Sequence, residues 1–297
     1  MTDDGAKCVF PSGFTNRHGE PLPLIVQKSD GGFGYAATDL AAVRHRVRDL
    51  GADQMLYVVG APQAQHLQMV FAVARMAGWL PEGVDVEHVS FGNVLGTDHR
   101  MLKSRDGDSV RLIDLLDEAV DRAAAAMATR AEANDEDHTD TLVLATGRML
   151  GIGAIKYADL STDRTRDYVF DWERMLAFEG NTGPYLQYAH ARVCSIFRRS
   201  NLTAGEIVLD DPHERSLGLL LLGYPEALDE TLSTASPHKL CAYLYNVAST
   251  FTDFYEHCRV LVADETTQRS RLGLCQLTAR VLSGGLSLLG IEAPDRM

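Results

Sequence analysis

The run Gln54-Met-Leu-Tyr-Val-Val-Gly60 decides the fold of the first third of the chain, because it is continuous, apolar and of strand length. Residues 63–78 follow it with helical period and end in a glycine that suits a helix C-cap. Two further apolar runs, Leu24–Gln27 and Val86–Leu95, flank this pair, and an amphipathic helix is expected over 38–50. Strands that alternate with helices predict a right-handed parallel α/β arrangement, with ligands at the carboxyl ends of the strands. About three parallel strands make a truncated Rossmann-like half.

The pattern changes at Val110, after which the sequence has helical period and no strand pattern. We expect a flexible lead-in over 1–22, a partial Rossmann-like domain over 23–109 and a helical bundle over 110–297. The fold class is therefore α/β followed by all-α. Helices are expected over 110–133, 139–158, 173–178, 182–200, 214–223, 225–233, 237–257 and 264–290.

The composition is that of an ordinary globular protein, with 45% hydrophobic and 23% charged residues among 297. No segment approaches the ~18 uninterrupted apolar residues of a membrane span, and the acidic N-terminus does not resemble a signal peptide, so we expect a cytoplasmic protein without a membrane partner. The net charge of -13 argues against non-specific binding to nucleic acid. A local basic face, such as Arg192, Arg198 and Arg199, still permits one polyanionic partner.

The five cysteines are dispersed and never form a C-x-x-C pair, so the sequence suggests neither a disulfide framework nor a zinc site. Buried thiols are the simplest interpretation. We expect no cofactor and no metal. The cysteines are Cys8, Cys194, Cys241, Cys258 and Cys275.

Two stretches carry a family resemblance, namely Gly34-Tyr-Ala-Ala-Thr-Asp-Leu-Ala-Ala42 and Glu179-Gly-Asn-Thr-Gly-Pro-Tyr-Leu-Gln-Tyr-Ala-His-Ala-Arg192. With shorter blocks in the same order, they resemble arginyl-tRNA synthetases over about residues 20–297. The resemblance implies the second half of a class I catalytic domain and an anticodon-binding helical domain. The half of the family's catalytic domain that carries the HxGH signature and binds ATP has no counterpart here. The segment Arg17-His-Gly-Glu20 is not that signature, because it lies in the polar lead-in. Met1 and the Arg-Met ending favour a complete short protein.

The resemblance implies that Tyr35, Asp39 and Gln63 hold the guanidinium of an arginine-like small molecule. The chemistry is suitable, because a carboxylate accepts two hydrogen bonds from a guanidinium, while a phenol and an amide fix the orientation of the guanidinium. His66 lies one helical turn after Gln63, and we consider it as a general base for an attacking amine. The alternative for His66 is a histidine that is merely hydrogen-bonded.

Two further regions are expected to contact tRNA. Lys103, Ser104 and Arg105 fit the basic KMSKS-like loop of the family, although Met101 stands where a lysine is common; the alternative is a solvated basic loop. In the helical region, the resemblance implies base stacking and phosphate contacts by tyrosine and arginine side chains, and the alternative is a set of core tyrosines. The candidates are Tyr185, Gln187, Tyr188 and Arg192 on one helix, with Tyr243, Tyr245 and Tyr255 on another.

The resemblance implies a pocket for an arginine-like molecule and a tRNA-binding bundle, but no ATP-binding half that could activate an amino acid. This combination predicts a protein that uses an aminoacyl-tRNA that is already charged. The hypothesis is an aminoacyl-tRNA-dependent transferase that forms an amide on a guanidino acceptor in a specialised pathway, such as antibiotic biosynthesis. One alternative is a non-catalytic tRNA-binding paralogue or one half of a split synthetase. The other is a fragment of a longer arginyl-tRNA synthetase, an arginine–tRNA ligase.

Overall fold

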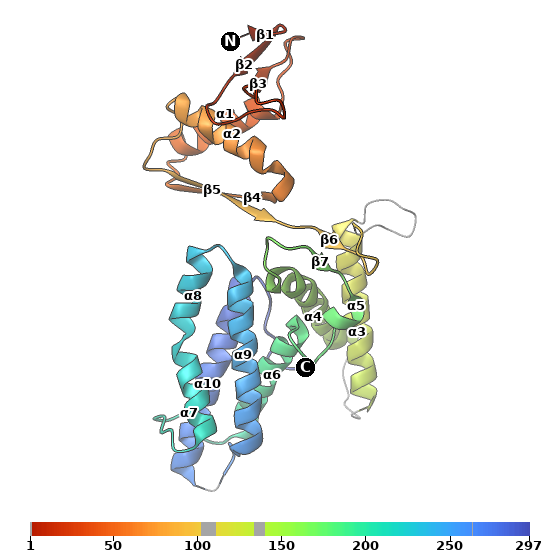
Figure 1. Ribbon diagram of the computed structural model, residues 1–297. Coiled ribbons are helices and arrows are strands. Elements are labelled where there is room, and N and C mark those ends of the chain that lie inside the picture. The colour runs from red at the N-terminus through yellow and green to blue at the C-terminus, as the bar shows by residue number, and fades with distance from the viewer. Residues whose placement is uncertain (1, 102–110, 134–139, 263) are drawn as a thin grey trace. The chain divides into compact units, whose positions relative to one another are not determined.

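The computed structural model describes residues 2–101, 111–133, 140–262 and 264–297. The chain divides into two compact units, Met1–Gly92 and Asn93–Met297. Helices dominate the second unit, and most of the strands belong to the first (Figure 1).

The first unit contains a parallel pair of strands with one helical crossover. β4 (Gln54–Gly60) and β5 (Asp85–Phe91) pair along their full length. The chain between them forms the short 3-10 helix η1 (Ala61–Gln63) and then α2 (Ala64–Met76). The glycine expected at the end of this helix is Gly78, whose φ of 71° is the left-handed conformation that a helix end favours.

α1 (Tyr35–Arg48) packs beside α2, and the two helices bury the core of the first unit. Leu40 and Val43 come from α1, and Leu67 and Val70 come from α2. The spacing of three residues within each pair places both side chains on one helix face, so these helices form because each has an apolar stripe to bury.

A second sheet in this unit is antiparallel, which the sequence analysis did not predict. β1 (Thr2–Asp3), β2 (Ala6–Val9) and β3 (Leu24–Gln27) lie in that order. Strands therefore occur in the region expected to be a flexible lead-in, and the predicted strand over 24–27 joins them and not the parallel pair. β2 was missed because four residues with one buried side chain, Cys8, carry too little periodicity.

The third predicted strand, over 86–95, is broken in two. β5 ends at Phe91, whereas β6 (Val94–Leu95) belongs to the second unit and pairs in parallel with β7 (Tyr168–Val169). Asn93, just before β6, donates its backbone N–H to Asp167 Oδ1 over 2.6 Å. β7 contradicts the expectation of no strand after residue 110; two residues give no pattern to recognise.

The second unit is a helical bundle, as predicted, and the predicted fold class of mixed α/β followed by helices is confirmed. Several helices begin at the capping residues that their sequences supply, and Asp211 forms a full capping box with Glu214. The helices are α3 (Leu112–Ala133), α4 (Asp140–Ser161), α5 (Trp172–Met175), α6 (Gly183–Arg199), α7 (Pro212–Leu222), α8 (Tyr224–Ser233), α9 (Pro237–His257) and α10 (Glu265–Leu288).

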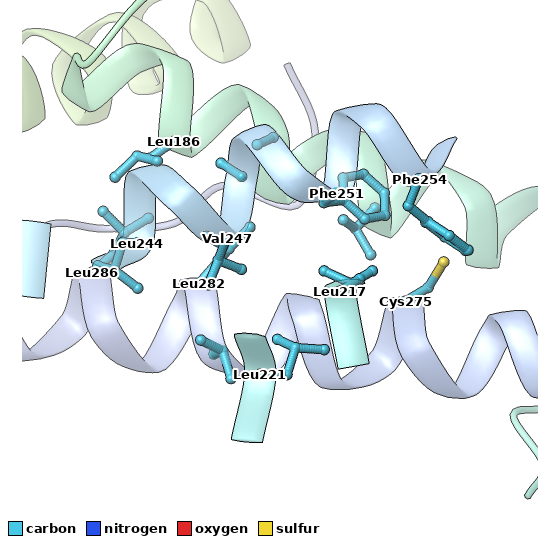
Figure 2. Close-up of a cluster of buried hydrophobic side chains, with 14 of the residues drawn as sticks. Leu186, Leu217, Leu221, Leu244, Val247, Phe251, Phe254, Cys275, Leu282 and Leu286 are labelled. Carbon is cyan, nitrogen blue, oxygen red and sulfur yellow. The ribbon is translucent and has the colours of Figure 1, made fainter. Parts of the chain in front are cut away.

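The main core of the bundle lies between α9 and α10. Leu244 and Val247 of α9 lie close to Leu286 and Leu282 of α10 in Figure 2, and these four side chains are fully buried, as is Phe251 further along α9. Four of the five cysteines are buried as well, which confirms the expected buried thiols, while Cys194 is half-buried. Among the described residues, no helix is long and apolar enough to cross a bilayer.

Candidate functional site

The residues predicted to bind an arginine-like ligand line one cleft in the first unit. Its volume is about 740 Å³. Tyr35 and Asp39 come from the first two turns of α1, which follows β3. Gln63 is the last residue of η1 and the N-cap of α2, and His66 lies in the first turn of α2. The cleft thus lies beside β3 and after the carboxyl end of β4. The other lining residues are Pro23, Leu24, Ile25, Lys28, Gly34, Ala36 and Pro62.

A hydrogen bond ties two of these side chains together. His66 Nε2 lies 2.7 Å from Asp39 Oδ2, and the two side chains are 33% and 35% exposed. The contact uses one carboxylate oxygen of Asp39 and leaves Oδ1 for another donor. Tyr35, by contrast, is 87% exposed at the cleft, so its ring is accessible to a ligand.

Lys28 is a lining residue to which the sequence analysis gave no role. Lys28 contributes a positive charge to the cleft, and Asp39 contributes a negative charge to the same cleft. An amino acid with a cationic side chain has the complementary pattern, because its guanidinium suits Asp39 and its carboxylate suits a lysine. Nothing in the sequence indicated that this lysine lines the same cleft as Asp39.

The candidate basic loop remains a prediction. Lys103, Ser104 and Arg105 lie outside the described residues. Met101, the departure from the family pattern, is described; it is exposed and forms an isolated bridge with Leu95.

In the second unit, the predicted tRNA-contacting residues on α6 lie in different surroundings. Tyr185 packs against the core, with its ring 5.8 Å from that of Tyr245. Tyr188 is half-buried. The guanidinium of Arg192 lies 4.4 Å from the ring centre of Tyr255, a cation–π contact between α6 and α9. The structure therefore brings Arg192 together with a tyrosine of the second predicted set, and the role of these residues in tRNA binding remains a prediction.

A second cleft, of about 480 Å³, lies beside this contact and was not predicted. Tyr255 offers an aromatic face, and Arg199 and Arg259 offer positive charge, which are the groups that bind unpaired bases and phosphates. Sequence reasoning missed it because the residues come from the end of α6 and from the end of α9 with the segment after it. The remaining lining residues are Ile196, Glu256, His257, Val260 and Leu261.

The α/β unit with its cleft and the helical bundle that follows it correspond, in this order, to two parts of the class I aminoacyl-tRNA synthetases. Residues 1–172 match the family described as tRNA synthetases class I (R), catalytic domain, and residues 186–297 match the DALR anticodon binding domain. The chain belongs to the arginyl-tRNA synthetase family, as its sequence resemblance implied. The domain boundaries at 22 and 109 remain predictions.

Known proteins resemble the chain along its whole length. It is 52% identical to the arginine–tRNA ligase of Frankia casuarinae and 51% identical to that of Thermobifida fusca, over 99% and 100% of this chain but only 50% and 52% of those proteins. The arginyl-tRNA synthetase structures from Plasmodium falciparum and Thermus thermophilus superpose with TM-scores of 0.84 and 0.85, at 32% and 28% identity. These matches cover 100% and 99% of this chain, and 50% and 54% of those chains. The chain thus spans about half the length of the curated relatives it matches.

Proposed function

We propose that this chain supplies the arginine-binding cleft and the tRNA-binding bundle of an arginyl-tRNA synthetase. A second, upstream half with the HxGH signature completes the catalytic site for ligating arginine to tRNA. The observation that carries this proposal is the cleft itself, where Tyr35, Asp39, Gln63 and His66 meet in a chain half as long as its relatives.

Arginine is bound at both of its ends. The guanidinium donates to Asp39, while Tyr35 and Gln63 fix its orientation, and Lys28 attracts the α-carboxylate. His66 donates from Nε2 to Asp39 Oδ2 and holds the carboxylate in place. In this account His66 is a positioning residue, and no general base is needed for arginine binding.

Exposed apolar side chains on the parallel sheet of the first unit support the proposal that another half of the catalytic domain covers this sheet. Leu56 and Val58 point to the same face of β4, because side chains two residues apart share a face, and they are 52% and 67% exposed. Apolar side chains on a sheet face are normally covered by another layer. The occupant that we propose is the upstream half of the catalytic domain, on the same polypeptide or on a separate one.

The transferase hypothesis requires the same two clefts but finds less support. The relatives are named as arginine–tRNA ligases, which favours ligation over amide formation on a guanidino acceptor. We therefore prefer the alternative, in which the chain is part of an arginyl-tRNA synthetase, to a specialised biosynthetic role. A non-catalytic tRNA-binding paralogue would not need the arginine cleft.

Arginylation of tRNA with labelled arginine tests the proposal. The chain is combined with the half of the Frankia casuarinae protein that it does not cover, and each part is also assayed alone. We expect labelled tRNA only from the combination. Amide formed by the chain alone from aminoacyl-tRNA and an arginine-like amine would overturn the proposal in favour of the transferase.

A further inference from the structure

The segment between α9 and α10 carries Arg259 to the cleft of about 480 Å³. Arg259 belongs to neither helix, because α9 ends at His257 and α10 begins at Glu265. Cys258 has an extended backbone, in which successive side chains point to opposite sides. Cys258 and Val260 are 1% and 3% exposed, whereas Arg259 between them is exposed. Burial of both neighbours therefore turns the Arg259 side chain outward.

The other arginine whose charge was assigned to this cleft, Arg199, is held by its own helix. Its Nε donates to the carbonyl oxygen of Ser195, one turn earlier on α6, and its Nη2 donates to Ser195 Oγ, both over 3.3 Å. Arg259 has no helical turn that could hold it in this way. Among the residues that the structure describes, no carboxylate forms an ion pair with Arg259. Its charge is therefore available to a ligand, and its position has to be fixed through its backbone.

Arg271 of α10 holds this backbone. Its Nη1 donates to the carbonyl oxygen of Arg259 over 2.7 Å, and its Nε donates to Glu214 Oε1 over 2.7 Å. The donors of a guanidinium lie in one rigid plane, so a group that is fixed at Nε presents Nη1 in a defined direction. Arg271 thus joins the segment that carries Arg259 to α7.

Glu214 is itself fixed at the start of α7. Its Oε2 accepts the backbone N–H groups of Asp210 and Asp211, each over 3.0 Å, so both carboxylate oxygens are in use. The side chains of Glu214 and Arg271 are only 4% and 17% exposed. A buried ion pair contributes little net stability, because desolvation of the two charges opposes their attraction. Its main consequence here is geometric, since it sets the position of the Arg259 carbonyl oxygen.

We propose that Arg271 is a positioning residue for tRNA binding, and that its contacts with Glu214 and with the Arg259 backbone direct the Arg259 guanidinium at a tRNA phosphate. The inference rests on the proposed function, because it takes this cleft as a tRNA-binding surface. A guanidinium binds a phosphate through two parallel hydrogen bonds. A backbone that is fixed before the ligand arrives lowers the entropic cost of that contact.

A double-mutant cycle on the intact chain tests the role of Arg271. The measurement is fluorescence anisotropy of labelled arginine-accepting tRNA over a range of salt concentrations. We expect Arg259→Gln to reduce the dependence of log affinity on log salt by about one unit. Arg271→Lys should weaken binding roughly fivefold, because an ammonium lacks the fixed plane of donors that holds the Arg259 carbonyl. In the Arg259→Gln background, Arg271→Lys should have no further effect.

A purely structural role of Arg271 predicts the same loss of affinity in both backgrounds, and that result would overturn the proposal. Arg269→Lys is the matched control, because Arg269 lies on the same helix, pairs with Glu265 and does not line the cleft. It should leave affinity and slope unchanged. Circular dichroism confirms that each variant folds before its affinity is compared.

The salt slopes also separate this inference from the proposed function. A slope that falls with Arg199→Gln but not with Arg259→Gln would overturn only the role of Arg259 and Arg271. Slopes unchanged in both variants would overturn the tRNA-binding cleft as well.

Modification of arginines by phenylglyoxal, mapped by mass spectrometry, tests the phosphate contact in the wild type and needs no variant. We expect bound tRNA to protect Arg259 and to leave Arg269 reactive. Equal reactivity of Arg259 with and without tRNA would overturn the proposal.

Discussion

His66 Nε2 lies 2.7 Å from Asp39 Oδ2, and this contact joins the first turn of α2 to the second turn of α1. The two helices pack on each other and share one core, so the position of the carboxylate in the cleft is fixed before a ligand arrives. Pre-orientation of this kind lowers the entropic cost of binding. The fold therefore holds the Asp39 carboxylate in the cleft through contacts from both helices.

Asp39→Asn is expected to weaken arginine binding by about 1.5–3 kcal/mol, roughly 10- to 150-fold, because a neutral amide replaces the charged partner of the guanidinium. Calorimetry of arginine binding to the chain measures the effect. Asp49→Asn is the control, since Asp49 lies at the end of the same helix, is also paired with a histidine and is not in the cleft. Equal losses in the two variants would remove Asp39 from the site.

His66→Ala is expected to weaken arginine binding by about 1 kcal/mol, roughly fivefold, through loss of one hydrogen bond to Asp39. His66→Gln should restore most of the affinity, because an amide can also donate to the carboxylate. In the Asp39→Asn background, His66→Ala should have little further effect, as coupled residues are not additive. Additive losses would instead indicate that His66 contacts the ligand by itself.

Lys28→Met should reduce the preference of the cleft for arginine over its decarboxylated analogue, because only arginine presents a carboxylate to the lysine. The ratio of the two dissociation constants is the measurement, and we expect it to fall roughly 10-fold from the loss of one charge-assisted contact. Lys7→Met, on the exposed side of β2, is the control. An unchanged ratio would show that Lys28 does not meet the carboxylate.

Arg199→Gln is expected to weaken tRNA binding and to reduce the dependence of log affinity on log salt by about one unit, as one phosphate contact is lost. Fluorescence anisotropy with labelled tRNA over a range of salt concentrations gives both quantities. Arg280→Gln changes an exposed arginine of α10 outside the cleft and should leave the slope unchanged. The same slope in the Arg199 variant and the wild type would exclude a phosphate contact there.

The sequence predicted those elements that have a long apolar run or a clear helical periodicity of apolar residues. β4 over 54–60 and α9 over 237–257 have the predicted bounds, because long apolar runs and helical stripes leave few alternatives. β1, β2 and β7 were not predicted, since strands of two to four residues are specified by their pairing partners and not by their own pattern.

The candidate sites show the same limit. Asp39 and His66 were singled out on the family resemblance and on helical spacing, and the packing of α1 on α2 brings them together. Lys28 and Arg199 could not be assigned to clefts, because that requires knowing which distant segments meet. For the same reason, the contact of Arg271 with Glu214, 57 residues earlier in the chain, left no signal in the sequence.

We propose that this chain binds arginine productively only with the other half of the catalytic domain. Arginine-dependent exchange between ATP and pyrophosphate tests it most directly, with the chain alone, with the uncovered half of the Frankia casuarinae protein alone, and with both. We expect exchange only in the combination, and we expect Asp39→Asn but not Asp49→Asn to abolish it. Robust exchange by the chain alone, or exchange in the combination that Asp39→Asn leaves intact, would contradict it.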